Sequence, residues 1–217
     1  MSFPLKALGV DMQRNVTILR LASGKLIIHS TAPFSEEDVL AIRELGSPAW
    51  LVDVLLRHDT FSKEGSEAFP AAQYLAPGGF EAMGDIFTHP LIPPPPEWEK
   101  EIAVEAIEGA PAFGEIVMLH RPSRTLIVGD LLFNFSPEGN LWKRLLLALG
   151  SVGCQHHPGI SRPFKAAIKD RAAFSRSIRR VLDWDFDRII VGHGNPILAG
   201  GKETLRRTLS AAGIGGL

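Results

Sequence analysis

Thr125-Leu-Ile-Val-Gly-Asp130 is the stretch that decides the fold of this sequence, and Arg188-Ile-Ile-Val-Gly-His193 repeats its design near the carboxyl end. In both, a short apolar run stops at a glycine and delivers one polar side chain, Asp130 or His193. A third run, Trp50–Leu56, leads into His58 in the same manner. Strands of an open α/β sheet form ligand crevices at their carboxyl ends. The three side chains are therefore predicted to gather at one sheet edge, and their types are those of metal ligands.

The rest of the chain alternates between strand and helix patterns. Pairs of β-rich runs separated by turn residues predict hairpins at 16–29 and 114–128. Ser35-Glu-Glu-Asp38 resembles a capping box and predicts a helix that ends at Gly46. The remaining runs predict strands at 50–56, 101–107 and 188–191, a loop at 57–65, helices at 71–76, 141–149, 163–182 and 202–212, and an extended connector at 93–96. This order indicates an α/β fold in which two β-rich halves pack sheet against sheet, with helices outside.

Composition sets broad limits on the kind of protein. A chain of 217 residues suits a single domain over 1–217. Its 23 Lys and Arg residues nearly balance 24 Asp and Glu residues, so no nucleic-acid partner is expected. The single cysteine cannot form an internal disulfide, and no apolar run reaches the roughly 18 residues of a membrane span. We expect a soluble, cytoplasmic protein that binds a small molecule and no membrane, with its oligomeric state left open.

The order of these elements resembles that of the metallo-β-lactamase superfamily. The resemblance is carried by the hairpin, the strand that ends in a His-containing loop, the hairpin that ends in Gly-Asp and the late strand that ends in Gly-His. In residues, 125–134 and 184–195 are similar to an uncharacterised branch of that superfamily, a domain-of-unknown-function family. The resemblance implies a four-layer α/β/β/α sandwich with two mixed sheets and a metal site at one edge of both.

This sequence departs from the superfamily's ligand pattern, His-x-His-x-Asp-His. With the first histidine at His58, the remaining ligand positions fall on Thr60, Ser62 and Lys63, and the further histidine expected near 109–111 is absent. The motif is therefore degenerate. Two-metal hydrolases hold each ion with about three protein ligands. His58, Asp130 and His193 suffice for one divalent ion (zinc, iron or manganese) and not for two.

Lys63 offers a second interpretation of the pocket. An ammonium at a ligand position repels a cation and would instead pair with Asp130, which would keep the pocket balanced without metal. Thr60, Ser62 and Lys63, which stand where the superfamily has ligands, are predicted to be substrate-binding residues. If Lys63 does point at Asp130, the hydrolase interpretation largely fails.

Two functions from different classes fit these residues. In the first, the chain is a metallo-β-lactamase-like hydrolase with at most one metal, in which the catalytic Asp130 orients water toward a small ester, thioester, lactone or phosphoester. In the second, it is a non-catalytic descendant that binds a small anionic ligand without metal. Purely structural roles are also open for two of these residues, because His58 and Asp130 could each cap a turn. His193 lies between two glycines and has little to pack against, which favours a role in a site.

Other candidates are weaker. Cys154, His156 and His157 lack a second pair at zinc-site spacing and form a loop that could rim the pocket. The basic face of 163–182 is most simply a solvated helix face. The sequence does not tell whether the loops 79–98 and 151–163 close over the site.

Overall fold

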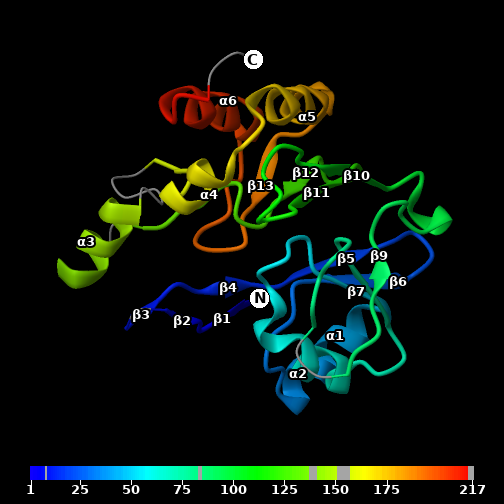
Figure 1. The fold of residues 1–217 in the computed structure, drawn as a ribbon. Coiled ribbons are helices and arrows are strands. Elements are labelled where there is room, and N and C mark those ends of the chain that lie inside the picture. Colours follow the sequence, from blue (N-terminus) through cyan, green and yellow to red (C-terminus); the bar gives the residue numbers. More distant parts are fainter. Residues whose placement is uncertain (8, 83–84, 137–140, 151–156, 215–217) are drawn as a thin grey trace.

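The computed structural model describes residues 1–7, 9–82, 85–136, 141–150 and 157–214. Two sheets dominate it (Figure 1). The five-stranded sheet contains β5 (Thr17–Arg20), β6 (Lys25–His29), β7 (Ser47–Val52), β8 (Gln73–Ala76) and β9 (His89–Pro90). The four-stranded sheet contains β10 (Ile102–Ala106), β11 (Ile116–His120), β12 (Thr125–Ile127) and β13 (Arg188–Ile190).

Helices cover the outer face of each sheet. Figure 1 shows α5 (Arg171–Asp183) and α6 (Gly201–Ala211) over the four-stranded sheet, and α1 (Glu36–Leu45) and α2 (Ser62–Ala68) on the far side of the five-stranded sheet. The two sheets pack against each other through a shared apolar cluster that includes Ile27, Trp50, Val52, Met118 and Ile127. This arrangement confirms the predicted four-layer α/β/β/α sandwich.

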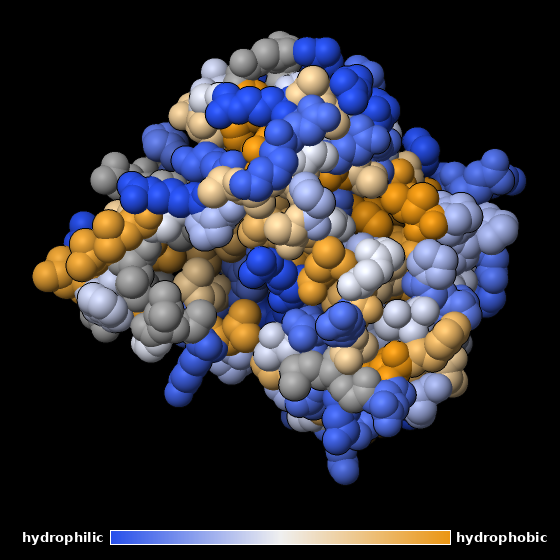
Figure 2. Space-filling view, in the orientation of Figure 1, coloured by the Kyte–Doolittle hydropathy of each residue, from blue (hydrophilic) through white to orange (hydrophobic). Residues whose placement is uncertain are grey.

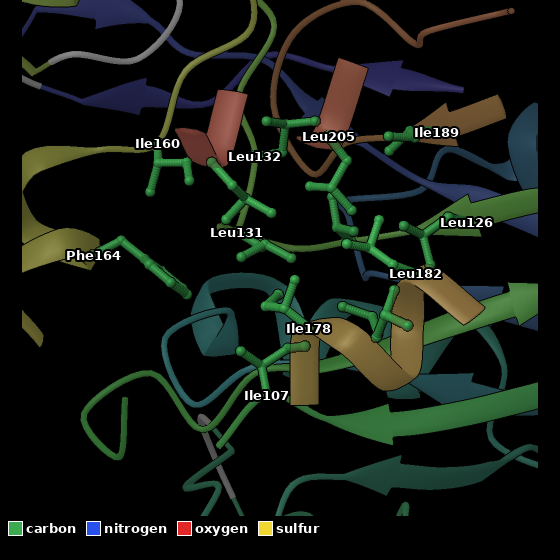
Figure 3. Packing of buried hydrophobic residues seen from close by; sticks show 14 of the residues in the cluster. Ile107, Leu126, Leu131, Leu132, Ile160, Phe164, Ile178, Leu182, Ile189 and Leu205 are labelled. Atoms are coloured by element: carbon green, nitrogen blue, oxygen red, sulfur yellow. The ribbon is translucent and has the colours of Figure 1, made fainter. Parts of the chain in front are cut away.

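The largest core cluster lies between the four-stranded sheet and its helices. Ile178 and Leu182 of α5 and Leu205 of α6 pack on Leu126 and Ile189 of the sheet (Figure 3). All but Leu182 are fully buried. Truncating such a side chain to alanine typically costs about 2–5 kcal/mol, so this layer anchors the strands that end at Asp130 and His193.

The register of strands β12 and β13 explains why Asp130 and His193 lie side by side. β12 and β13 are parallel neighbours, and Thr125 pairs with Arg188. Asp130 follows Thr125 by the same number of residues as His193 follows Arg188. The two polar residues therefore leave the same sheet edge side by side. β7, which is parallel to β6 and β8 in the other sheet, brings His58 to that edge.

Within residues 1–7 and 9–15, two short antiparallel ladders form beside the main sheets (Figure 1). β1 (Ser2–Phe3) pairs with β4 (Arg14–Asn15), and β2 (Lys6–Ala7) pairs with β3 (Val10–Asp11). We call residues 1–15 the N-terminal arm. The backbone N–H of Asn15 donates to the carbonyl of Gly192, so the arm joins the sheet edge that carries His193.

Three sequence predictions about elements are wrong. Residues 71–76 are not a helix, because β8 pairs with β7 and buries Tyr74 and Leu75 on the sheet. The predicted loop 57–65 contains a 3-10 turn (Asp59–Phe61) and the start of α2. The predicted helix 163–182 is two helices, since Ile168 is extended after α4 (Arg162–Ala167) and the Asp170 side chain caps α5 anew.

The other predicted elements are present. Ser35 and Asp38 form the complete capping box at the start of α1, and α3 (Leu141–Gly150) and α6 match the helices expected at 141–149 and 202–212. A second 3-10 turn (Pro96–Trp98) closes the proline-rich connector. Within the described ranges, no helix has both the length and the apolar character that crossing a membrane requires. Residues 83–84 and 151–156, with Cys154 and His156, lie outside the description.

Candidate metal centre

His58, Asp130 and His193 meet at the shared edge of the two sheets. The Nε2 atoms of the histidines lie 3.3 Å apart, and Asp130 Oδ1 lies 3.5 Å from His58 Nε2 and 3.6 Å from His193 Nε2. Across the described residues, this is the group of His, Cys, Asp or Glu side chains whose atoms converge closely enough to hold an ion. The structure therefore brings together the three residues that the sequence singled out.

The donor atoms fit a single small cation. Tetrahedral zinc with bonds of about 2.0–2.1 Å separates its ligand atoms by about 3.3–3.4 Å, close to the spacings above. Asp130 Oδ1 is buried and accepts no well-formed hydrogen bond in the part of the chain that is described. A buried carboxylate oxygen without a donor is costly, and a cation at the centre of the three residues would satisfy it.

The N-terminal arm sets the orientation of His193. The ring Nδ1 of His193 faces the backbone carbonyl oxygen of Gln13 within hydrogen-bonding distance. Because a carbonyl only accepts, Nδ1 carries the proton and Nε2 presents its lone pair to the centre. Phe133 stacks on the imidazole, with ring centroids 5.6 Å apart and planes at 8°. The Asn15 amide donates to the carbonyls of Val191 and Gly194 and holds the loop on both sides of His193.

A buried glutamate sets the position of Asp130. The two carboxyl oxygens of Glu115 accept the backbone N–H groups of Gly129, at 2.9 Å, and Asp130, at 3.0 Å. Burial and the nearby Asp130 charge raise the pKa of Glu115 to about 8, although these backbone donors oppose the shift. The strand end that carries Asp130 is thus tied to β11 by a side chain as well as by the sheet.

A second polar network lies behind His58. The fully buried guanidinium of Arg14 donates to the carbonyl oxygens of Thr31, at 2.6 Å, and His58, at 2.8 Å, and lies 3.3 Å from Asp53 Oδ1. The Tyr74 hydroxyl donates to the other oxygen of Asp53. Burial raises the pKa of Asp53 to about 6, while Arg14 and Tyr74 counteract it. Arg14 and Asp53 thus balance each other's charge and hold the turn that presents His58.

At neutral pH, His58 and Asp130 are in the protonation states that bind a cation. Burial, followed by the charge of Arg14, lowers the pKa of His58 to about 4, so its ring is neutral. Burial alone would raise the pKa of Asp130, but contact with His58 and the neighbouring positive charges bring it below its ordinary value. A neutral imidazole and an ionised carboxylate are the forms that bind metal.

The predicted substrate-binding residues do not join this centre. Thr60 is exposed on the 3-10 turn, and the buried Ser62 hydroxyl donates to the carbonyl of Asp59. Lys63 is 64% exposed and lies 3.9 Å from Glu67 one turn along α2. The predicted Lys63–Asp130 ion pair is wrong, because helix α2 turns Lys63 toward solvent. Arg14 is a buried cation whose charge acts on Asp130.

The other histidines that the structure describes do not belong to the group of three ligands. His120 is bonded to Ser123, His157 is exposed beside α6, and His89 stacks edge-on against Phe87. His29, at the end of β6, is buried without a hydrogen-bond partner in the described chain. None of them supplies the ligands that the degenerate motif lacks.

Sequence reasoning missed most of the supporting residues. Gln13, Arg14, Asn15 and Glu115 lie in segments with no ligand pattern. Asp53 was the available signal, because a carboxylate inside the apolar run Trp50–Leu56 must find a buried partner. The sequence did not identify Arg14 as that partner.

Comparison with solved structures identifies the fold. The DIM-1 metallo-beta-lactamase matches with a TM-score of 0.62 at 16% identity, over 98% of this chain and 91% of the other. A metallo-beta-lactamase from Pontibacter korlensis matches with 0.59 at 12% identity, over 98% and 93%. The FIM-1 enzyme from Pseudomonas aeruginosa, in a mono-zinc form, matches with 0.58 at 15% identity, over 98% and 88%. No family profile and no curated protein matches by sequence.

The chain therefore has the metallo-β-lactamase fold, as the order of its motifs predicted. At these identities the likeness concerns the fold. The chemistry must be argued from the centre itself.

Proposed function

We propose that this protein is a metal-dependent hydrolase that works with one divalent ion and cleaves a small ester, thioester or phosphoester. The observation that carries the proposal is the convergence of His58 Nε2, Asp130 Oδ1 and His193 Nε2 with mutual spacings of 3.3–3.6 Å. The buried Asp130 oxygen without a donor adds to it. That the FIM-1 enzyme is described in a mono-zinc form supports one ion as a workable number for this fold.

The three ligands would leave one position open for water or substrate, as catalytic zinc sites do. A bound divalent ion supplies Lewis acidity and lowers the pKa of water at the site. Asp130 orients that water through its carboxylate. Because the pKa of Asp130 lies below its ordinary value, this carboxylate holds a proton poorly at neutral pH, and its role is orientation more than proton storage. Phe133 stacks on one face of the His193 ring and helps to fix its orientation.

A second candidate is a metal-free pocket for a small anion. The observation in its favour is Arg14, a buried guanidinium that acts electrostatically on both His58 and Asp130. Arg14 is, however, already paired with Asp53 and two carbonyl groups. Because these groups already neutralise and hydrogen-bond the guanidinium, little of it is left to bind an anion. This favours the metal-dependent function.

Metal content per chain tests the proposal. Elemental mass spectrometry on tag-free protein purified without chelator should find close to one zinc, iron or manganese per chain. Asp130→Ala and His193→Ala should lose it, whereas His120→Ala, which removes a histidine outside the centre, should keep it. The loaded protein should hydrolyse p-nitrophenyl esters, acyl thioesters or bis(p-nitrophenyl) phosphate. Absence of metal even after incubation with excess ion would support the anion-binding pocket instead.

A further inference from the structure

Residues 13–15 of the N-terminal arm contact the segments that carry both histidine ligands, and these segments belong to different sheets. His58 follows β7 of the five-stranded sheet, and His193 follows β13 of the four-stranded sheet. Figure 1 shows the arm where the two halves of the molecule meet, and Figure 2 shows hydrophilic side chains at the centre of this face, between those halves. Strands of different sheets share no ladder of hydrogen bonds, so other contacts must set the distance between the two imidazoles.

The Arg14 side chain reaches the His58 turn from the arm. Its guanidinium is 1% exposed and donates to the carbonyl oxygens of Thr31, at 2.6 Å, and His58, at 2.8 Å. His58 lies in a turn, with a φ of −104° and a ψ of 27°. Hydrogen bonds between the sheets, such as that from the Leu56 N–H to the Phe113 carbonyl at 2.9 Å, act on residues before His58 and leave its own carbonyl to Arg14. Because this carbonyl and the imidazole belong to one residue, the bond from Arg14 limits where the ring can lie.

Asn15, the next residue, holds the loop that carries His193. Its side-chain amide donates to the carbonyl oxygens of Val191, at 2.9 Å, and Gly194, at 2.6 Å. Its backbone N–H donates to the carbonyl of Gly192, at 2.9 Å. These carbonyls belong to residues on both sides of His193, so the loop cannot shift relative to the arm without breaking the bonds.

We propose that residues 13–15 form a clamp that sets the spacing of the two histidine ligands. Arg14 is the positioning residue of His58. Asn15 is the positioning residue of His193. The inference rests on the proposed metal-dependent function and extends it to the arm. It also implies reciprocity, because a clamp that favours the spacing that binds an ion must itself be favoured by a bound ion.

A purely structural role for Arg14 makes different predictions. Arg14 lies 3.3 Å from Asp53 Oδ1, and the Tyr74 hydroxyl donates to the other carboxyl oxygen of Asp53. If Arg14 only neutralised Asp53, another cation would serve as well. The clamp requires instead the bridge between the Thr31 and His58 carbonyls. The ammonium of a lysine, on its flexible stem, does not present donors in the fixed directions of the planar guanidinium.

Metal affinity and cobalt spectra of three variants of the full chain test the proposal. Arg14→Lys keeps the charge but loses the planar fork, and Asn15→Leu keeps the size but removes both amide donors. Each should bind zinc about 10–100-fold more weakly, the loss typical of an outer partner of a ligand. Each should also change the visible absorption of the Co²⁺-loaded protein, which reports coordination geometry.

Tyr74→Phe is the matched control. It removes a buried hydrogen bond of the same network but leaves the bonds of the clamp in place. The Tm should fall by about 2–4 °C, whereas zinc affinity and the cobalt spectrum should stay those of the unaltered protein. A role in stability alone would not produce this difference between the variants.

Hydrogen exchange of the unaltered protein adds a test that needs no variant. The N–H of Asn15 is bonded to the Gly192 carbonyl, so exchange of the peptide that contains residues 13–16 reports docking of the arm. By reciprocity, zinc should slow this exchange about tenfold or more.

Four results would overturn the clamp. Equal zinc affinity and unchanged cobalt spectra in all variants would do so while the proposed function stands. Exchange of residues 13–16 that zinc leaves unchanged would do the same. Equal losses of affinity in Arg14→Lys and Tyr74→Phe would reduce Arg14 to a member of a structural network. An unaltered protein that binds no metal, even in excess ion, would overturn the proposed function and the clamp together.

Discussion

His193 Nδ1 is hydrogen-bonded to the backbone carbonyl of Gln13, a residue 180 positions earlier in the chain. The contact fixes the imidazole tautomer that presents a lone pair at Nε2, and it couples the N-terminal arm to the metal centre. Metal-binding histidines usually have such an outer partner, and losing it typically costs 10–100-fold in metal affinity. A backbone atom fills that role here, so only a change in backbone conformation can remove it.

Gln13→Pro should therefore weaken metal binding about 10–100-fold. Gln13 has a φ of 53°, whereas proline requires a φ near −65°, so the carbonyl would turn away from His193. Gln13→Gly tolerates positive φ and should retain the affinity of the unaltered protein. Zinc titration against a chelating indicator measures both variants. Equal affinities for the two would contradict the role assigned to this carbonyl.

Glu115→Gln should loosen the strand end that carries Asp130. Both carboxyl oxygens of Glu115 accept a hydrogen bond from a backbone N–H group. An amide has only one acceptor oxygen, so in the variant one of these N–H groups would face the amide NH₂ and lose its hydrogen bond. We expect about 1–3 kcal/mol lower free energy of unfolding and metal affinity reduced about tenfold. Urea denaturation and the indicator titration measure these effects. Glu108→Gln, which changes a half-exposed carboxylate outside the centre, should alter neither; a Glu115 variant equal to it would refute the prediction.

Gly192→Ala should disturb the junction of the three strand ends. A Cβ at this position would lie 2.9 Å from the Gly129 carbonyl oxygen and 3.3 Å from His58 Cε1. Overpacking of this kind costs about 1–3 kcal/mol, and it should lower metal occupancy because it pushes His58 from its partners. A Cβ at Gly78 would meet nothing within 4 Å. The free energy of unfolding of Gly78→Ala should therefore stay within about 0.5 kcal/mol of that of the unaltered protein. Thermal unfolding with and without added zinc distinguishes the two, and indistinguishable variants would refute the steric argument.

Acidification should destabilise the fold through His29. Burial, followed by the charges of His58 and Arg14, lowers the pKa of His29 from 6.5 to about 3. The folded state keeps this ring neutral while the unfolded chain protonates it below pH 6.5. Its contribution to stability is therefore present above that pH and is lost progressively as the pH falls toward 3. Near pH 5, the slope of unfolding free energy against pH should be steeper by about 1.4 kcal/mol per unit than in His29→Leu. Equal slopes in urea denaturation series would contradict this.

The fold could be predicted from sequence because its signals are local. The capping box at Ser35, the apolar runs of β7, β12 and β13, and the polar residue after each run are properties of neighbouring residues. Where local signals were ambiguous, tertiary packing decided the outcome. Residues 73–76 suit either a short helix or a strand, and pairing with β7 made them a strand. The single helix expected at 163–182 is interrupted at Ile168, where the backbone is extended and α4 ends.

The sequence by itself determined which residues can reach the centre. His58, Asp130 and His193 each follow a strand, and equal offsets in a parallel pair of strands place the last two side by side. Only the tertiary structure decided what surrounds them. Arg14, not Lys63, is the buried cation beside the centre, Glu115 holds Asp130, and a carbonyl of the N-terminal arm orients His193. The Glu115 contact forms across one hairpin, whereas the contacts of Arg14 and Gln13 join segments that are distant in sequence and share no pattern, so they exist only once the N-terminal arm has packed against the sheet edge.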